Sequence, residues 1–93
     1  MNMIIVAMPA YNEEGTIAKI ILKAKKYVDK VVVVDDGSDD MTAELADALG
    51  AMVVRHKENK GYGAAIRTCF ETAKELNADI MVTLERNFDY EYD

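Results

Sequence analysis

The amino-acid sequence predicts an α/β fold, with a mostly parallel, open sheet that carries helices on both faces. Short apolar runs alternate with segments whose apolar residues recur at helical spacing. Each predicted helix joins two predicted strands through short loops, an order that favours parallel strands with right-handed crossovers. The sequence contains no internal repeat and no low-complexity stretch that would indicate another architecture.

The first two predicted elements are a strand over residues 3–8 and the helix that follows it. The apolar run of the strand ends at Pro9, and Asn12 is expected to cap the helix, with acidic residues in its first turn. Apolar residues recur at helical spacing and predict one inward stripe. This stripe comprises Ile17, Ile20, Ile21, Ala24 and Val28.

The second predicted strand, residues 30–35, contains four consecutive valines, a composition that suits a strand buried on both faces. Asp35 and Asp36 follow at its carboxyl end, and Gly37 stands where the chain must turn sharply. Each of the next three residues is able to cap the following helix. These are Ser38, Asp39 and Asp40.

The remaining elements repeat the same order. We predict a helix over about 40–49, a strand over 51–55, a helix over about 62–76 and a strand over 80–84. The inward residues of the two helices are expected to be Leu45, Ala46 and Leu49, then Ile66, Cys69, Phe70 and Ala73. Residues 1–84 are therefore expected to form the α/β domain, and the acidic, aromatic residues 85–93 an unpacked tail.

Composition narrows the possible functions. The 93 residues suffice for one small domain, and 11 basic against 17 acidic residues argue against nucleic acid as a partner. The single cysteine, Cys69, excludes a disulfide within the chain and is expected to be a buried thiol. We interpret the only histidine, His56, as a loop residue. The sequence lacks a signal-peptide pattern and an apolar run of membrane-spanning length, so we expect a cytoplasmic protein.

Three loops that leave the carboxyl ends of predicted strands carry polar side chains. Ligands of open parallel sheets bind at this edge. Tyr11 in the first loop could stack on a planar base, and a nearby acid could accept hydrogen bonds from ribose hydroxyls. In the third loop, Lys60 stands among glycines at a helix N-terminus, a place that favours an anion. Taken one at a time, these loops could equally hold helix caps and a core tyrosine.

Together, the loops resemble the N-terminal, nucleotide-binding half of the inverting glycosyltransferases of family 2, which have the GT-A fold. The most similar members are of the dolichyl-phosphate-mannose synthase type. The resemblance rests on Pro-Ala-Tyr-Asn-Glu-Glu (9–14), Val-Val-Val-Asp-Asp-Gly-Ser-Asp-Asp (32–40) and Asn-Lys-Gly-Tyr-Gly-Ala-Ala-Ile-Arg (59–67). The motifs follow the family's order and spacing, and the resemblance extends to Leu84.

The resemblance implies a site for a UDP- or GDP-linked sugar and transfer of the sugar to a lipid phosphate or a glycan. Tyr11 should lie against the base, Glu13 should approach the ribose, and Asp36 should accept a hydrogen bond from the base. The 59–63 loop should border the base or the diphosphate. The implied nucleotide-binding residues are Pro9, Tyr11, Glu13, Asp35, Asp36, Lys60 and Gly61.

The chain departs from the family pattern after Leu84. The family has an Asp-X-Asp motif that holds a divalent metal, whereas this sequence has Glu85, Arg86 and Asn87. Glu85 is the remaining candidate ligand for Mg²⁺ or Mn²⁺. The acceptor half and its general base would lie beyond this point. We therefore expect nucleotide-sugar binding without full catalysis, in a natural truncation, a frameshifted product or a fragment.

Three further interpretations follow from the same residues. The strands at 3–8 and 80–84 are candidates for an exposed sheet edge, through which we expect the chain to form a homo-oligomer. A non-catalytic nucleotide-binding or regulatory module is the alternative function. A flavodoxin-like response receiver also places paired acids after a strand, but there they would follow the first strand and not the second.

Overall fold

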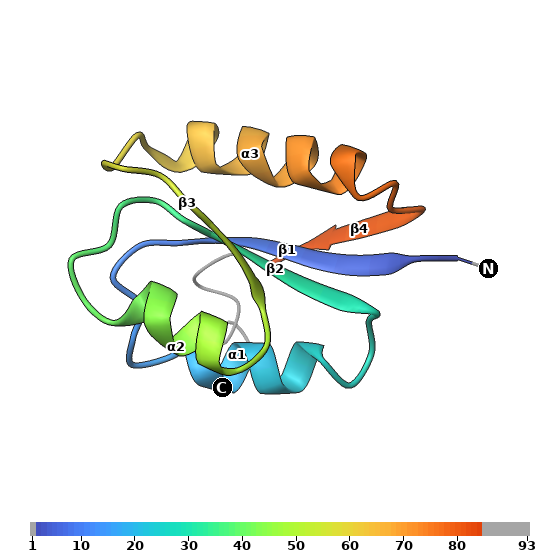
Figure 1. The fold of residues 1–93 in the computed structure, drawn as a ribbon, viewed down its shortest axis with the longest axis horizontal. Helices are drawn as coiled ribbons and strands as arrows, with labels where there is room; N and C mark the ends of the chain where they lie inside the picture. The colour runs from blue at the N-terminus through green and yellow to red at the C-terminus, as the bar shows by residue number, and fades with distance from the viewer. Residues whose placement is uncertain (1, 85–93) are drawn as a thin grey trace.

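The computed structural model describes residues 2–84 and has four parallel strands with helices on both faces of the sheet (Figure 1). The strands lie in the order β3-β2-β1-β4. This architecture confirms the predicted α/β class. The elements are β1 (Ile4–Ala10), α1 (Ile17–Ala24), β2 (Lys30–Asp35), α2 (Thr42–Ala48), β3 (Met52–Arg55), α3 (Tyr62–Glu75) and β4 (Ile80–Thr83).

Two hydrophobic cores lie on opposite faces of the sheet, because successive side chains of a strand point to opposite sides. Val31 and Val33 of β2 pack with α1 and α2, whereas Val32 and Val34 pack with α3. All four valines are at most 3% exposed, as predicted for a strand covered on both faces. Burying each stabilises the fold by roughly 1.5–3 kcal/mol relative to an exposed side chain.

Strand β1 continues through Pro9 to Ala10, so the prediction that Pro9 ends it is wrong. The carbonyl of Ala10 accepts the N–H of Asp36, which shows that Ala10 directs its polar groups toward β2. Pro9 therefore faces the β4 side, where the pairing has already ended at Ala7 and Thr83. The missing N–H of the proline breaks no ladder bond there.

Helix α1 begins later than Asn12, and the predicted cap is wrong. The residue before its first turn is Thr16, whose side chain makes no capping hydrogen bond. Asn12 has a positive φ of 50°, and its side-chain oxygen accepts the N–H of Asp39 in the neighbouring loop. The predicted inward stripe of α1 is correct, since Ile17, Ile21 and Ala24 are buried.

The prediction that Phe70 of helix α3 faces inward is wrong. Its buried residues, Ala65, Cys69, Thr72 and Ala73, repeat at spacings of three and four, whereas Phe70 is 58% exposed. Cys69 is fully buried, and burial raises the pKa of its thiol to about 11, as suits an inert core residue. Within residues 2–84, no helix has the length and apolar character needed to cross a membrane.

Candidate functional site

An open pocket of about 200 Å³ lies where the carboxyl ends of β1 and β2 meet the start of α3. Of the predicted nucleotide-binding residues, it brings together Pro9, Tyr11, Glu13, Asp36 and Gly61. The rest of the lining comes from Ala10, Asn59, Tyr62 and Ala65. Residues more than fifty positions apart in the sequence thus converge on one hollow.

The Asp36 carboxylate is held by three donors of the chain. Its Oδ1 accepts hydrogen bonds from the His56 ring at 2.7 Å and from the Lys60 N–H at 2.9 Å. Its Oδ2 accepts the Gly61 N–H at 2.9 Å. Burial by itself would raise the pKa of Asp36, but these hydrogen bonds outweigh it and hold the pKa below the ordinary value of 3.8. Asp36 is therefore an anion that organises the 59–61 loop.

Asp36 retains acceptor capacity toward the pocket. A carboxylate offers about four lone-pair sites. Protein donors use two sites on Oδ1 and one on Oδ2. One lone pair of Oδ2 is thus left for a ligand N–H or O–H that enters the pocket.

Asp35 lies outside the pocket, although it is the neighbour of Asp36. It is fully buried and pairs with the Arg55 guanidinium, with 3.2 Å between Nε and Oδ2. It also accepts hydrogen bonds from the backbone N–H and the hydroxyl of Ser38. The structure therefore places Asp35 in the packing between β2, β3 and the next loop, where it faces away from the hollow.

The loops after β1 and β2 are joined by reciprocal side-chain to backbone hydrogen bonds. The hydroxyls of Ser38 and Thr42 accept the N–H groups of Asn12 and Glu13, each at 2.8 Å. Asp40 accepts the N–H of Thr42, the first residue of α2, although the N-cap position itself is Met41 and not one of the predicted capping residues. The two loops that carry Tyr11 and Asp36 are thereby fixed relative to each other.

The third loop contributes mainly backbone to the site. Lys60 is exposed and absent from the pocket lining, and its N–H binds Asp36. Gly61 immediately precedes α3 with a φ of +98°, a conformation that favours glycine. The first residues of the 14-residue α3 follow it, so the positive end of the helix dipole borders the pocket.

His56 is a site residue that sequence reasoning missed. Its side chain is 9% exposed and bridges two elements, with Nδ1 2.7 Å from Asp36 Oδ1 and Nε2 2.9 Å from Thr68 Oγ1 on α3. The only sequence signal was its place at the carboxyl end of a strand, which the other two loops share. Nothing in the sequence pattern indicated that its ring points inward.

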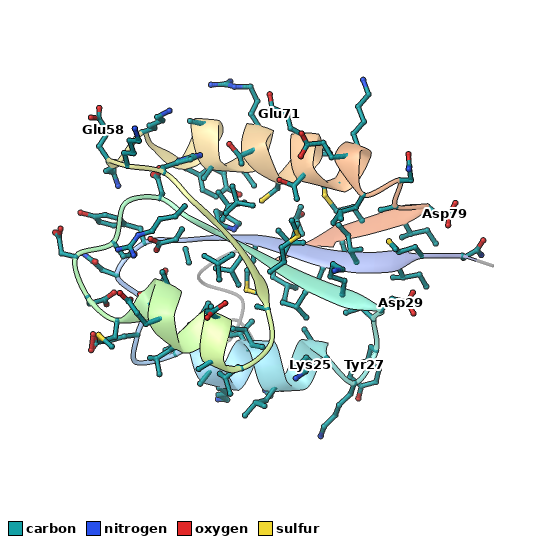
Figure 2. All side chains as sticks on the ribbon, viewed as in Figure 1. Lys25, Tyr27, Asp29, Glu58, Glu71 and Asp79 are labelled. Carbon is teal, nitrogen blue, oxygen red and sulfur yellow. The ribbon has the colours of Figure 1, made fainter. Side chains whose placement is uncertain are left out.

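Acidic residues also gather at the opposite end of the sheet, where they hold the start of β1. Figure 2 labels Asp29 and Asp79 at this end, far from Glu58 at the tip of the third loop. Asp29 accepts the Ile4 N–H at 2.8 Å and Asp79 accepts the Met3 N–H at 2.6 Å. These carboxylates accept hydrogen bonds from backbone N–H groups and do not line the pocket at the carboxyl ends of β1 and β2.

The described residues do not fit a divalent metal. Among residues 2–84, no three His, Cys, Asp or Glu side chains are grouped so that they could hold an ion. The pocket has two carboxylates, Glu13 and Asp36, and Asp36 already accepts three hydrogen bonds. The candidate ligand Glu85 and the expected tail 85–93 lie outside the described residues.

Comparison with known proteins finds a family match and similar enzymes. The sequence model of Glycosyl transferase family 2 matches residues 5–84. An uncharacterized protein of Methanocaldococcus jannaschii is 41% identical over 88% of this chain and 34% of its own length. A UDP-N-acetylglucosamine–dolichyl-phosphate N-acetylglucosaminyltransferase of Methanococcus voltae is 31% identical over 90% of this chain and 41% of its length.

A similar fold occurs in a solved enzyme structure. Glucosyl-3-phosphoglycerate synthase of Mycobacterium tuberculosis, crystallised with Mn²⁺, UDP and glucosyl-3-phosphoglycerate, superimposes with a TM-score of 0.75 at 32% identity. The match covers 90% of this chain and 33% of the synthase. The chain thus spans 33–41% of the length of these three proteins.

Proposed function

The chain belongs to glycosyl transferase family 2, and from this premise we propose that it binds the nucleoside-diphosphate part of a nucleotide sugar. The observation that carries the proposal is the convergence of Tyr11, Glu13, Asp36 and the start of α3 on one pocket. An aromatic ring, carboxylates and a helix N-terminus suit a base, a ribose and a diphosphate in turn. The UDP-bound synthase of similar fold supports this assignment.

The base is assigned to the part of the pocket between Tyr11 and Asp36. Tyr11 supplies a flat face for stacking, and the remaining lone pair of Asp36 accepts one N–H. Uracil and guanine carry a ring N–H beside a carbonyl, whereas adenine and neutral cytosine present a bare ring nitrogen. The acceptor character of Asp36 therefore favours UDP- or GDP-linked donors.

The ribose and diphosphate are assigned to the two sides of the same hollow. Glu13 accepts hydrogen bonds from ribose hydroxyls, for which a carboxylate is a strong acceptor. The diphosphate lies toward Gly61 and the first turn of α3, where the helix dipole favours negative charge. The Lys60 side chain is exposed in this loop, outside the pocket lining, and contributes positive charge to the same loop.

We propose that the family reaction, glycosyl transfer to a lipid phosphate or a glycan, is not completed by residues 2–84 alone. Transfer requires a base for the acceptor hydroxyl and positive charge on the departing diphosphate. The described residues contain no metal cluster, and the lowered pKa of Asp36 makes it a weak base for an acceptor hydroxyl. The name of the Methanococcus voltae transferase supports a lipid-phosphate acceptor, and for such an acceptor we propose a reaction at the cytoplasmic face of a membrane.

The test of binding is a titration of the isotope-labelled chain with UDP and GDP, followed by NMR. We expect saturable shifts at Tyr11, Asp36 and Gly61, and weaker or no shifts there with ADP and CDP. Repeating the UDP titration with Mn²⁺ measures whether the chain recruits a metal. Absence of shifts at these residues with millimolar UDP and GDP would refute the proposal.

Two alanine variants separate the pocket carboxylate from a structural one. Asp36→Ala should weaken UDP binding by about 1.5–3 kcal/mol, the value of a hydrogen bond to a charged group. Asp40→Ala removes a carboxylate of the same charge that binds the Thr42 N–H outside the pocket, and should weaken binding much less. Circular dichroism of both variants checks that the fold is retained. Equal losses in the two variants would contradict the role of Asp36.

A further inference from the structure

His56 does not line the nucleotide pocket but contacts Asp36, a residue that does. It follows β3, and its backbone N–H donates to the Asp35 carbonyl at 2.9 Å, so its backbone extends the sheet. Its ring does not line the pocket and reaches the pocket carboxylate Asp36 from the outer side. Asp36 in turn binds the N–H groups of Lys60 and Gly61. The ring is thus the support of a carboxylate that shapes the pocket.

The hydrogen-bond partners fix the orientation of the ring. The ionised Asp36 can only accept, so His56 Nδ1 donates to it. His56 Nε2 lies 2.9 Å from Thr68 Oγ1, and the Thr68 hydroxyl also lies 3.1 Å from the Ala64 carbonyl. The ring is thus held between the Asp36 carboxylate and helix α3.

We propose that His56 is a positioning residue of the nucleotide pocket: braced by Thr68, its ring donates from Nδ1 and holds the Asp36 carboxylate in the orientation that receives the base. The inference rests on the proposed function. It extends that function by making donor binding depend on a group that never touches the donor. Loss of the Nδ1 donor would remove one of the three hydrogen bonds that hold Asp36.

Polar and charged groups surround the His56 ring on several sides. From the end of β2 the ring faces Asp36, and from α3 it faces Thr68. On its outer side it lines a second hollow with Asp39, Arg55 and Lys57. Arg55 is paired with Asp35 and Glu44. Lys57 is exposed and contributes a neighbouring positive charge of the same loop, which makes it a matched control.

The first experiment needs no nucleotide. Nitrogen-15 NMR of the histidine ring in the free protein should show a proton on Nδ1 of His56. The amide protons of Lys60 and Gly61 should exchange faster in His56→Gln than in the wild type. A wild-type ring without a proton on Nδ1 would overturn the proposal, whether or not UDP binds.

The second experiment measures UDP affinity in two histidine variants. The amide of His56→Asn stands near the place of Nδ1 and can still donate to Asp36, whereas His56→Gln reaches toward Thr68. We expect UDP affinity to fall about tenfold in His56→Gln, because a charge-assisted hydrogen bond is lost, and much less in His56→Asn. Lys57→Gln changes an exposed residue of the same loop outside the pocket lining and should bind like the wild type. Wild-type affinity in a folded His56→Gln would overturn the proposal.

The comparison of His56→Asn with His56→Gln separates positioning of Asp36 from mere support of the fold. If the wild type binds no UDP, the proposed function fails, while the ring and amide measurements still decide the part of His56.

Discussion

Asp35 and Asp36 are adjacent in the sequence but have different roles, because successive side chains of a strand point to opposite faces of the sheet. Asp35 shares a face with Val31 and Val33, on the side of α1 and α2, where it meets Arg55. Asp36 shares a face with Val34, on the side of α3, where the pocket opens. The pair is thus one buried structural acid and one site acid, set apart by the two-residue period of the strand.

The lowered pKa of Asp36 predicts how stability depends on acid. The unfolded chain takes up the proton near the ordinary value of 3.8, whereas the folded chain takes it up only at lower pH. The contribution of Asp36 is therefore complete above pH 3.8 and is lost as the pH falls through the folded pKa. Urea unfolding between about pH 2 and 5 should show a shallower acid loss in Asp36→Asn than in the wild type.

Asp40 provides the internal comparison for this measurement. Its pKa is also lowered, because its hydrogen bonds with Thr42 and Glu14 outweigh the effect of burial. Asp40 is more exposed than Asp36, so solvent weakens the contribution of its carboxylate to stability. Asp40→Asn should therefore change the acid slope less. If Asp36→Asn kept the wild-type acid slope, the hydrogen bonds of Asp36 would stabilise the fold less than their geometry indicates.

At the scale of elements, the loops after β2 and β3 meet at Gly37. Its φ is +79°, and a side-chain carbon there would stand 2.5 Å from the Glu58 carbonyl carbon and 2.6 Å from the Asn59 nitrogen. Both contacts are to backbone, which cannot move aside as a flexible side chain does. Only glycine lets the 56–61 loop approach close enough for its N–H groups to reach Asp36.

Gly37→Ala should therefore destabilise the fold. The left-handed backbone alone costs about 1–2 kcal/mol, and the collision with residues 58 and 59 adds to it. The free energy of unfolding, measured by urea denaturation, should fall by at least this amount. Gly15→Ala is the control, because a side-chain carbon there meets nothing within 4 Å. Equal stabilities of the two variants would mean that the loops do not pack as closely as described.

The sequence predicted every strand and helix of the described region, because apolar runs and helical stripes are local patterns. It misjudged Pro9, Phe70 and Asn12, and in the last two cases a tertiary contact decided the outcome. The stripe of α3 is set by the small residues Ala65 and Ala73, which let the helix approach the sheet. Asn12 serves the neighbouring loop through Asp39, 27 residues away.

The site was predictable to the extent that topology determines it. Parallel strands place their carboxyl ends at one edge, so Tyr11, Asp36 and Gly61 were expected together, and the pocket unites them. The role of His56 was not predictable, because its ring meets Asp36 across 20 residues and Thr68 across 12. No local periodicity encodes such a meeting.

At the scale of the whole molecule, the two edges of the sheet differ. Among residues 2–84, β4 pairs only with β1, and its Ile80 and Val82 are 47% and 43% exposed. An apolar hollow of about 390 Å³ adjoins it, lined by Ile4, Val6, Ile20, Lys23, Ala24, Tyr27, Val28, Val82 and Leu84. The four residues of β4 carry neither a charge nor a proline, the features that normally keep an edge strand from pairing.

We expect two copies of the chain to pair through this edge, with the β4 strands antiparallel about a two-fold axis. Sedimentation at high micromolar concentration should show a dimer. The net charge of −6 opposes association, so added salt should strengthen the dimer by screening the repulsion. Val82→Lys should give a monomer, because it places a charge on the pairing edge. Met52→Lys, at the equally short β3 edge, should leave the dimer intact. A monodisperse wild-type monomer at every salt concentration would show that the exposed β4 edge does not recruit a second copy.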